Sequence, residues 1–165
     1  MQIRDARPAD ATAIAAIWAP IIRDTVITFN PVLRSPEDVV VMIRTRQGEG
    51  HAFLVAESDA GILGFATYSQ FRAGLGYAHT MEHTINLAPE ARGLGGGRRL
   101  LAALEAHAVA AGAHVMVAAI TGSNRPSVDF HAREGYAHAG TMPQVGRKFG
   151  RYHDLILMQK ILVQG

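Results

Sequence analysis

Hydrophobic positions recur along this chain with two different periods, which predicts a mixture of helices and strands. An apolar residue every three or four positions predicts a helix that begins near Asp10 and that Pro20 should kink or break. Ser35 followed by a proline and two acids is typical of a second helix start. The run 114–120 is almost continuously apolar, as expected for a strand buried on both faces.

The complete pattern predicts eleven elements in mixed order. Strands are expected at 2–5, 52–57, 62–71, 78–87, 114–120, 136–145 and 152–163, and helices after Asp10, from Ser35 to about Gly48, from a glycine-rich loop to about 111, and at 125–135. Alternation of this kind favours an α/β fold, in which a mixed sheet carries helices on both faces. Residues 146–151 are predicted to form the loop between the last two strands.

The stretch 81–101 is the most informative part of the sequence, because it predicts a strand, a glycine-rich loop and a helix in succession. Four glycines fall within five residues, from Gly93 to Gly97, and they let backbone N–H groups turn toward a ligand. The first N–H groups of the following helix have no partner within the helix. With Arg92, Arg98 and Arg99 beside it, the loop predicts a phosphate site, although a tight turn alone would use the same residues.

Two common phosphate loops do not match this stretch. The dinucleotide pattern G-x-G-x-x-G fails at its last glycine, and the P-loop lacks its lysine and hydroxyl pair. The spacing Arg92, Gly95, Gly97 fits Arg-x-x-Gly-x-Gly. This motif resembles the acetyl-CoA loop of the GCN5-related N-acetyltransferase (GNAT) superfamily. The order of predicted elements is also similar to that family over nearly the full length, which implies its mostly antiparallel central sheet.

Composition narrows the class of protein further. At 165 residues, the chain is expected to form a single domain, 1–165. A net charge of +2 without a basic, aromatic-rich run argues against a nucleic-acid surface. No apolar run approaches the roughly 20 residues that span a membrane. The chain has no cysteine, so thiolate chemistry and disulfides are excluded and a cytoplasmic location is expected.

Four further stretches resemble one subgroup, the phosphinothricin and methionine sulfoximine acetyltransferases. They are 79–83 (HTMEH), 114–118 (HVMVA), 130–136 (FHAREGY) and 145–152 (VGRKFGRY). Thr121-Gly122 departs from the subgroup, which often carries an acid there. The resemblance implies an acetyl-CoA-dependent enzyme that acetylates a small amino-acid analogue, and it implies a homodimer.

The resemblance places a catalytic glutamate at Glu82, which is expected to act as general base, directly or through a water. In a regular strand His83 faces the other way and is expected to pack, unless a bulge turns it inward. His131 stands where many relatives carry a tyrosine that protonates the leaving thiolate, a role open to histidine near neutral pH. A surface histidine remains the alternative.

Acetyl-CoA is expected to contact the strand, the loop and the next helix start. The main chain of Ile85, Asn86 and Leu87 should pair with the pantetheine arm, which requires this strand to splay from the strand 114–120. The expected cofactor residues in the loop and beyond are Arg92, Gly93, Leu94, Gly95, Gly96, Gly97, Arg98, Asn124 and Ser127. Asn124 could equally be only the cap of a helix.

A substrate carboxylate needs a cation, for which Arg72 and Lys148 are the candidates, with Phe29 and Tyr77 as apolar walls. The histidines show no metal-binding spacing, so no metal is expected. Two other functions stay open: acetylation of a protein N-terminus or a polyamine, and acyl-CoA sensing without turnover. The presence of both Glu82 and His131 argues against a sensor.

Overall fold

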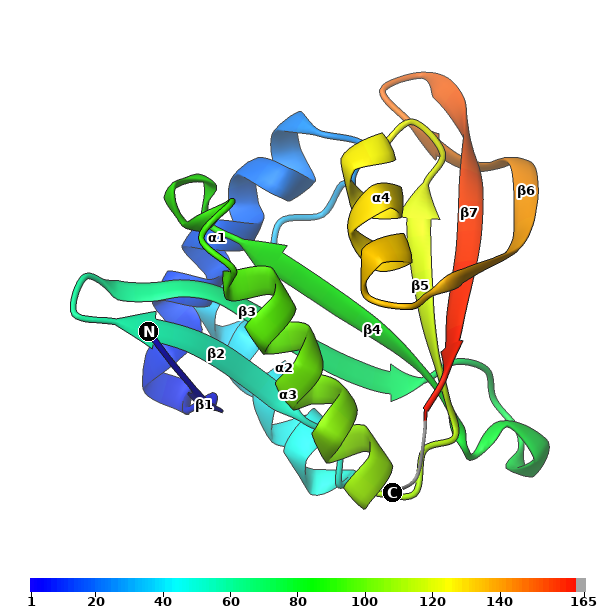
Figure 1. The fold of residues 1–165 in the computed structure, drawn as a ribbon. Helices are drawn as coiled ribbons and strands as arrows, with labels where there is room; N and C mark the ends of the chain where they lie inside the picture. The colour runs from blue at the N-terminus through cyan, green and yellow to red at the C-terminus, as the bar shows by residue number, and fades with distance from the viewer. Residues whose placement is uncertain (163–165) are drawn as a thin grey trace.

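A seven-stranded mixed sheet forms the centre of the protein in a computed structural model that describes residues 1–162 (Figure 1). The strands lie in the order β1-β2-β3-β4-β5-β7-β6, and all neighbours are antiparallel except β4 and β5. The strands are β1 (Gln2–Asp5), β2 (Phe53–Ser58), β3 (Gly61–Gln70), β4 (Thr80–Leu87), β5 (Val115–Thr121), β6 (Ala137–Lys148) and β7 (Arg151–Ile161). The expected α/β fold with a mostly antiparallel sheet is confirmed; Val163, the predicted end of the last strand, lies outside the described residues.

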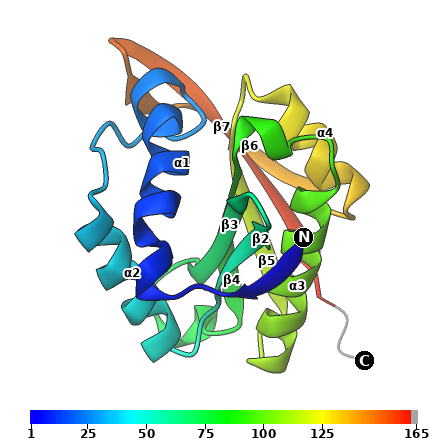
Figure 2. The ribbon, with the colours of Figure 1, turned by 90° about the vertical axis from the view of Figure 1, so that its left-hand side faces the viewer.

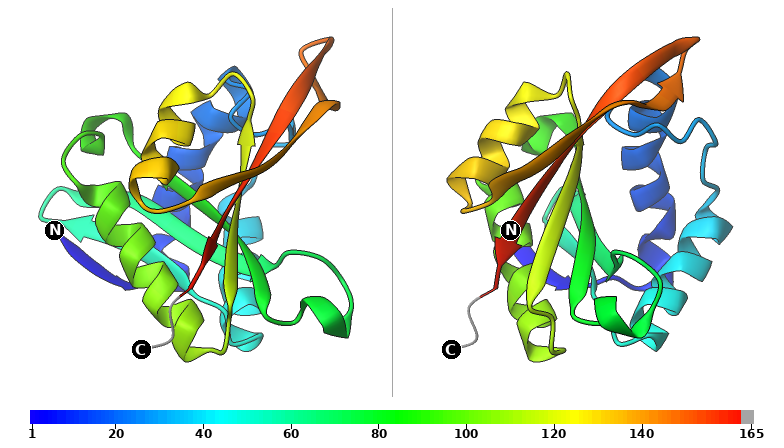
Figure 3. Two further views of the ribbon diagram at one scale, coloured as in Figure 1. Left: turned by 45° about the vertical axis from the view of Figure 1, so that its right-hand side comes forward. Right: turned by 90° about the vertical axis from the view of Figure 1, so that its right-hand side faces the viewer.

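Helices cover both faces of this sheet (Figures 2 and 3). They are α1 (Ala11–Asp24), α2 (Pro36–Gly48), α3 (Gly96–Ala110) and α4 (Arg125–Arg133). One core cluster joins α1 and α2 to the sheet around Trp18 and Phe65, and a second joins α3 to the opposite face around Leu100 and Met116. The two clusters agree with the apolar stripes read from the sequence.

Two local predictions need correction. Helix α1 does not break at Pro20 but continues to Asp24, because Pro20 is exposed while Ile21 and Ile22 beyond it are buried in the core. The predicted loop 146–151 is instead a tight hairpin. Strand β6 runs to Lys148, and only residues 149 and 150, both with positive φ (53° and 71°), form the turn.

Strand β6 reaches Lys148 because its pairing with β7 resumes at Gly146 after an irregular stretch. The register shifts between Met142 and Gly146, where Gln144 adopts a positive φ of 57° and donates its N–H to Asp154. Such a bulge bends a strand. The β6–β7 hairpin consequently extends past the sheet toward the loop between α1 and α2 (Figure 3).

Candidate active site

Strands β4 and β5 diverge soon after they begin. They pair only at Thr80, Met81 and Glu82, opposite 115–117, while β4 keeps its pairing with β3 along its whole length. The splay that acetyl-CoA binding requires is therefore present. It leaves one edge of β4 without a strand partner from residue 83 onward.

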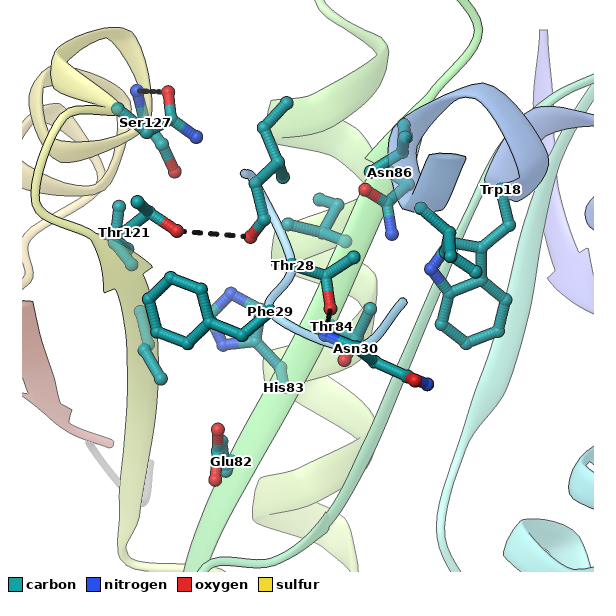
Figure 4. A pocket seen from close by; sticks show the side chains of 18 of the residues that line it. Trp18, Thr28, Phe29, Asn30, Glu82, His83, Thr84, Asn86, Thr121 and Ser127 are labelled. Atoms are coloured by element: carbon teal, nitrogen blue, oxygen red, sulfur yellow. Dashed lines mark hydrogen bonds between the residues drawn. The ribbon is translucent and has the colours of Figure 1, made fainter. Parts of the chain in front are cut away.

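A cavity of about 410 Å³ lies in this gap (Figure 4). It is bounded by β4, β5, the start of α4 and the loop 25–34. Its lining residues are Trp18, Ile21, Ile22, Ile27, Thr28, Phe29, Asn30, Arg34, Glu82, His83, Thr84, Ile85, Asn86, Ala118, Ala119, Ile120, Thr121, Asn124, Ser127, His131 and Leu155. Glu82 and Phe29 were both expected at the site, and the structure brings them into one cavity.

The glycine-rich loop leads from the end of β4 into α3. Gly93 and Gly95 have positive φ values of 75° and 79°, and Gly95 is the N-cap of the helix. The first turn of α3 closes with the Arg99 N–H on the Gly95 carbonyl at 3.1 Å, so the earlier N–H groups have no acceptor within the helix. This arrangement can bind an anion such as a pyrophosphate.

Two of the glycines are buried where α3 packs on neighbouring segments. Gly97 is buried, and a Cβ there would lie 3.4 Å from Leu87 and 3.5 Å from Phe130. Gly96 packs in the same way against Met1 and Leu87. The start of α3 therefore packs against Leu87 at the end of β4, beside the open strand edge.

Glu82 lies at the vertex where β4 and β5 separate, since it belongs to the last pair before the gap (Figure 4). Its side chain is half-buried and forms no ion pair with any residue from 1 to 162. Burial raises the pKa of the Glu82 carboxyl above its ordinary value. A carboxylate whose basicity is increased in this way is suited to accept a proton from an amine.

His83 and His131 form a buried pair on the α3–α4 side of the same gap. Their Nε2 atoms lie 3.0 Å apart, and His131 places its Nδ1 2.7 Å from the Ser127 carbonyl. Because a carbonyl only accepts, Nδ1 of His131 carries a proton, and the neutral ring then accepts from His83 through Nε2. No bulge occurs in β4, so His83 points away from Glu82 as expected.

The surroundings keep both imidazoles neutral. The pKa of His83 is lowered to about 3, mainly by burial and to a smaller extent by the neighbouring His131 ring. Burial also lowers the pKa of His131. The ring of Tyr136 packs edge-on against both histidines, and the Tyr136 hydroxyl donates a hydrogen bond to the Glu105 carboxylate. His131 is thus a buried cavity residue and not a surface histidine.

Asn124 and Ser127 occupy the start of α4, where the cavity meets the helix. The Asn124 side-chain oxygen accepts the Ser127 N–H at 3.3 Å, so Asn124 is the helix cap. Its amide nitrogen has no hydrogen-bond partner within residues 1–162 and borders the cavity. Both roles expected for Asn124 are therefore compatible with its position.

The loop 25–34 closes the cavity on the side opposite the histidine pair and is held by two distant segments. Thr121, at the end of β5, donates its hydroxyl to the Val26 carbonyl. Phe29 stacks on His153 with ring centroids 5.8 Å apart, and a Cβ on Gly146 would lie 2.3 Å from the Phe29 ring. Gly146 is required for that close approach.

Lys148 is the strongest of these anchors. Its ammonium donates to the carbonyl oxygens of Ile22, Thr25 and Thr28 at 2.6, 2.7 and 2.8 Å, and the residue is only 4% exposed. All three donors of the ammonium are used in this way. Lys148 thereby joins the end of α1 to the loop 25–34.

The geometry does not support the prediction that Arg72 and Lys148 bind a substrate carboxylate. Neither side chain lines the cavity, and Lys148 has no free donor. Arg72 and Tyr77 are exposed on the β3–β4 loop, where the guanidinium lies 5.7 Å from the ring centroid. Sequence reasoning placed them at the site because it could not follow the paths of these loops.

Several cavity residues were not predicted. Trp18, one of the apolar positions of α1, is buried against Phe65 and also borders the cavity. Thr28 and Arg34 belong to the loop 25–34, whose position depends on the far hairpin. The chain from residue 1 to 162 contains no group of three or more metal-binding side chains. No helix in that part of the chain is long and apolar enough to cross a membrane.

Comparison with known proteins agrees with the fold. Residues 19–136 match the model of the acetyltransferase (GNAT) family. The chain is 42% identical to an L-methionine sulfoximine/L-methionine sulfone acetyltransferase of Pseudomonas aeruginosa, over 95% of this chain and 92% of that protein. It is 36% identical to a phosphinothricin N-acetyltransferase of Alcaligenes faecalis, over 99% of this chain and 83% of that protein.

Two solved structures are similar over almost the whole chain. A ribosomal-protein-alanine N-acetyltransferase from Brucella melitensis has a TM-score of 0.95 and 38% identity, covering 98% of this chain and all of that one (100%). The Salmonella typhimurium acetyltransferase yncA, solved with its cofactor acetyl-CoA, has a TM-score of 0.95 and 35% identity, covering 100% and 95%. The chain belongs to the GNAT family of acetyltransferases.

Replacing Lys148 by methionine should lower the free energy of unfolding by about 1–3 kcal/mol, because three carbonyl oxygens lose their donor in a buried position. Urea unfolding measures the change. Arg147→Met is the matched control, since Arg147 is the exposed neighbour on the same strand, and it should change stability little. Equal stability of the two variants would show that Lys148 does not hold the loop.

Proposed function

We propose that this acetyltransferase moves the acetyl group of acetyl-CoA to the α-amino group of a small amino-acid analogue, by direct attack in a ternary complex. The observation that carries the proposal is the continuity of the site. The glycine-rich loop leads to the open edge of β4, and that edge and Glu82 line one cavity. A cofactor arm and an acceptor amine can therefore meet beside a carboxylate.

The proposed cofactor contacts follow this path. The backbone of Gly93 to Arg98, with Arg92 nearby, binds the pyrophosphate at the start of α3. The main chain of Ile85, Asn86 and Leu87 pairs with the amide groups of the pantetheine arm, in place of the strand that is missing beyond residue 82. Asn124 adds its free amide nitrogen, and Ser127 lies one helical turn from it.

The proposed reaction uses Glu82 and His131, which lie on either side of the gap. Glu82, directly or through a water, removes a proton from the acceptor ammonium, and the free amine then attacks the thioester carbon. The carbon–sulfur bond breaks and the CoA thiolate leaves. The attacking nitrogen then loses its surplus proton, and the thiolate takes one up. His131 relays this proton through Nε2 once that atom leaves His83, because its own proton is held on Nδ1 by the Ser127 carbonyl.

The substrate class is proposed from the relatives and the cavity together. Methionine sulfoximine, methionine sulfone and phosphinothricin are the acceptors in the names of two relatives. A cavity of about 410 Å³ with one side lined by the loop 25–34 suits a compact acceptor of that size. Acetylation of a protein N-terminus is the second candidate, because a similar structure is a ribosomal-protein-alanine N-acetyltransferase. A polyamine fits less well, since Glu82 is the one acid among the described lining residues.

Thiol release from acetyl-CoA tests the proposed function, and a chain without cysteine gives no background in a disulfide-exchange assay. We expect turnover with methionine sulfoximine, methionine sulfone or phosphinothricin, and little with a peptide that begins with alanine. Turnover with the peptide alone would favour the second candidate. Binding of CoA without turnover of any of these amines would contradict the proposal.

Glu82→Gln should lower kcat by ~10²–10⁴-fold with little change in the KM for acetyl-CoA, because the general base is lost while the cofactor path is intact. A base must be unprotonated, so wild-type kcat/KM should rise with pH through the raised pKa of Glu82. That acid limb should disappear in Glu82→Gln. Glu37→Gln, an exposed position on α2, is the control; an unchanged rate in Glu82→Gln would exclude this base.

We further propose a cytoplasmic homodimer. The hairpin tip and the nearby loop expose several large apolar side chains, among them Val32, Val145, Phe149 and Tyr152. Exposed apolar surface of this kind is typical of an interface. Light scattering on a size-exclusion column should give twice the 17.7 kDa mass of the chain, and a monomer would refute the dimer.

A further inference from the structure

The acceptor in the proposed reaction carries an acidic group, which needs a cationic partner. The two cations predicted for this role, Lys148 and Arg72, do not supply it. Lys148 is occupied by carbonyl oxygens and Arg72 lies outside the cavity. Among the described residues that line the cavity, the one lysine or arginine is Arg34. We propose that Arg34 binds the anionic oxygen group of the acceptor and selects for acidic amines; this inference rests on the proposed function.

Arg34 is held by the ring of Trp18. Its guanidinium carbon lies 4.9 Å from the ring centroid, and the residue is half-buried. Trp18 is fixed in turn, because it is 8% exposed and packs on Phe65 with centroids 4.8 Å apart. A guanidinium that stacks on an aromatic face is oriented, and its edge remains available for two parallel hydrogen bonds to an acid.

The donors of Arg34 are not used within the protein. No hydrogen bond or ion pair joins its side chain to any residue from 1 to 162, and its Nε is buried without a partner. A buried donor in this state is unfavourable, and an oxygen of a bound ligand would satisfy it. Arg34 is therefore a cation whose donors are free to bind an anion.

Neighbouring charges do not neutralise Arg34. Asp38 and Arg46 line a shallow groove with it on the outer side of α2. The Asp38 carboxylate accepts the Ser35 N–H at 2.9 Å as part of the helix cap, and Arg46 is near Glu49. Among the described residues that line the cavity, the charged side chains are therefore Glu82 and Arg34. Glu82 can interact with the amino group of the acceptor, and Arg34 with its acidic group.

The acidic group could be the α-carboxylate or an acid at the other end of the acceptor, such as the phosphinate of phosphinothricin. Both offer two oxygens to a guanidinium. The experiment separates them by comparing two pairs of acceptors. Methionine sulfone is compared with its carboxamide, which lacks the carboxylate, and phosphinothricin is compared with methionine sulfone, which lacks the second acid.

The test measures kcat/KM for these acceptors with wild type, Arg34→Gln and Arg34→Lys. Wild type should favour the acidic member of one pair by ~10–100-fold, as a charged hydrogen bond supplies, and Arg34→Gln should lose that preference. Arg34→Lys should recover part of it, because the charge remains. Arg44→Gln removes an exposed arginine of α2 and should leave the preference unchanged.

A second readout does not depend on turnover. Trp18 is the single tryptophan of the chain, so its fluorescence reports on the residue that contacts Arg34. Titration with methionine sulfone or phosphinothricin should give a saturable change in wild type, with an affinity ~10–100-fold weaker in Arg34→Gln. Saturation without thiol release would contradict the proposed function alone. Equal discrimination and equal affinity in wild type and Arg34→Gln would overturn the role of Arg34.

Discussion

The separation of β4 from β5 is the constraint on which the rest of the site depends. Each strand keeps one complete partner: β4 pairs with β3 over seven residues, 64–70, and β5 pairs with β7 over 115–121. Their shared pairing stops after residue 82. The sheet is consequently two smaller sheets joined at one end, with an unpaired backbone edge facing the space between them. A peptide-like ligand is the natural partner for such an edge.

The buried polar residues gather around this gap for the same reason. Most of the buried polar or charged side chains line the cavity or hold its wall, namely His83, Asn86, Thr121, His131 and Lys148. Apolar clusters cover both faces of the sheet, and the other two buried polar residues, Asp10 and Thr67, have hydrogen-bond partners within the protein. A buried polar group needs a partner, and here the partners are carbonyl oxygens, another imidazole or, as we propose, the substrate. Most of the polar interior thus lies around the cavity in which we propose that the reaction occurs.

Sequence reasoning succeeded where the determinants are local. The start of α3 could be predicted because glycines, arginines and the following apolar stripe are consecutive in the chain. The resemblance added the catalytic role expected of Glu82, and the family was confirmed. Lys148 was misjudged because its three acceptors lie more than 100 residues away. Arg34 was missed because no local pattern reveals that the loop 25–34 folds over Trp18.

The wall formed by the loop 25–34 depends on segments that have no part in the cofactor path. Phe29 needs Gly146 and His153, and the loop backbone needs Lys148 and Thr121. The glycine-rich loop and α3, by contrast, pack on the end of β4 from the opposite face. Because the proposed cofactor path does not include the hairpin or the loop 25–34, changes in either should alter acceptor selection more than cofactor binding. A fold organised in this way can retain one reaction and exchange the amine that it modifies.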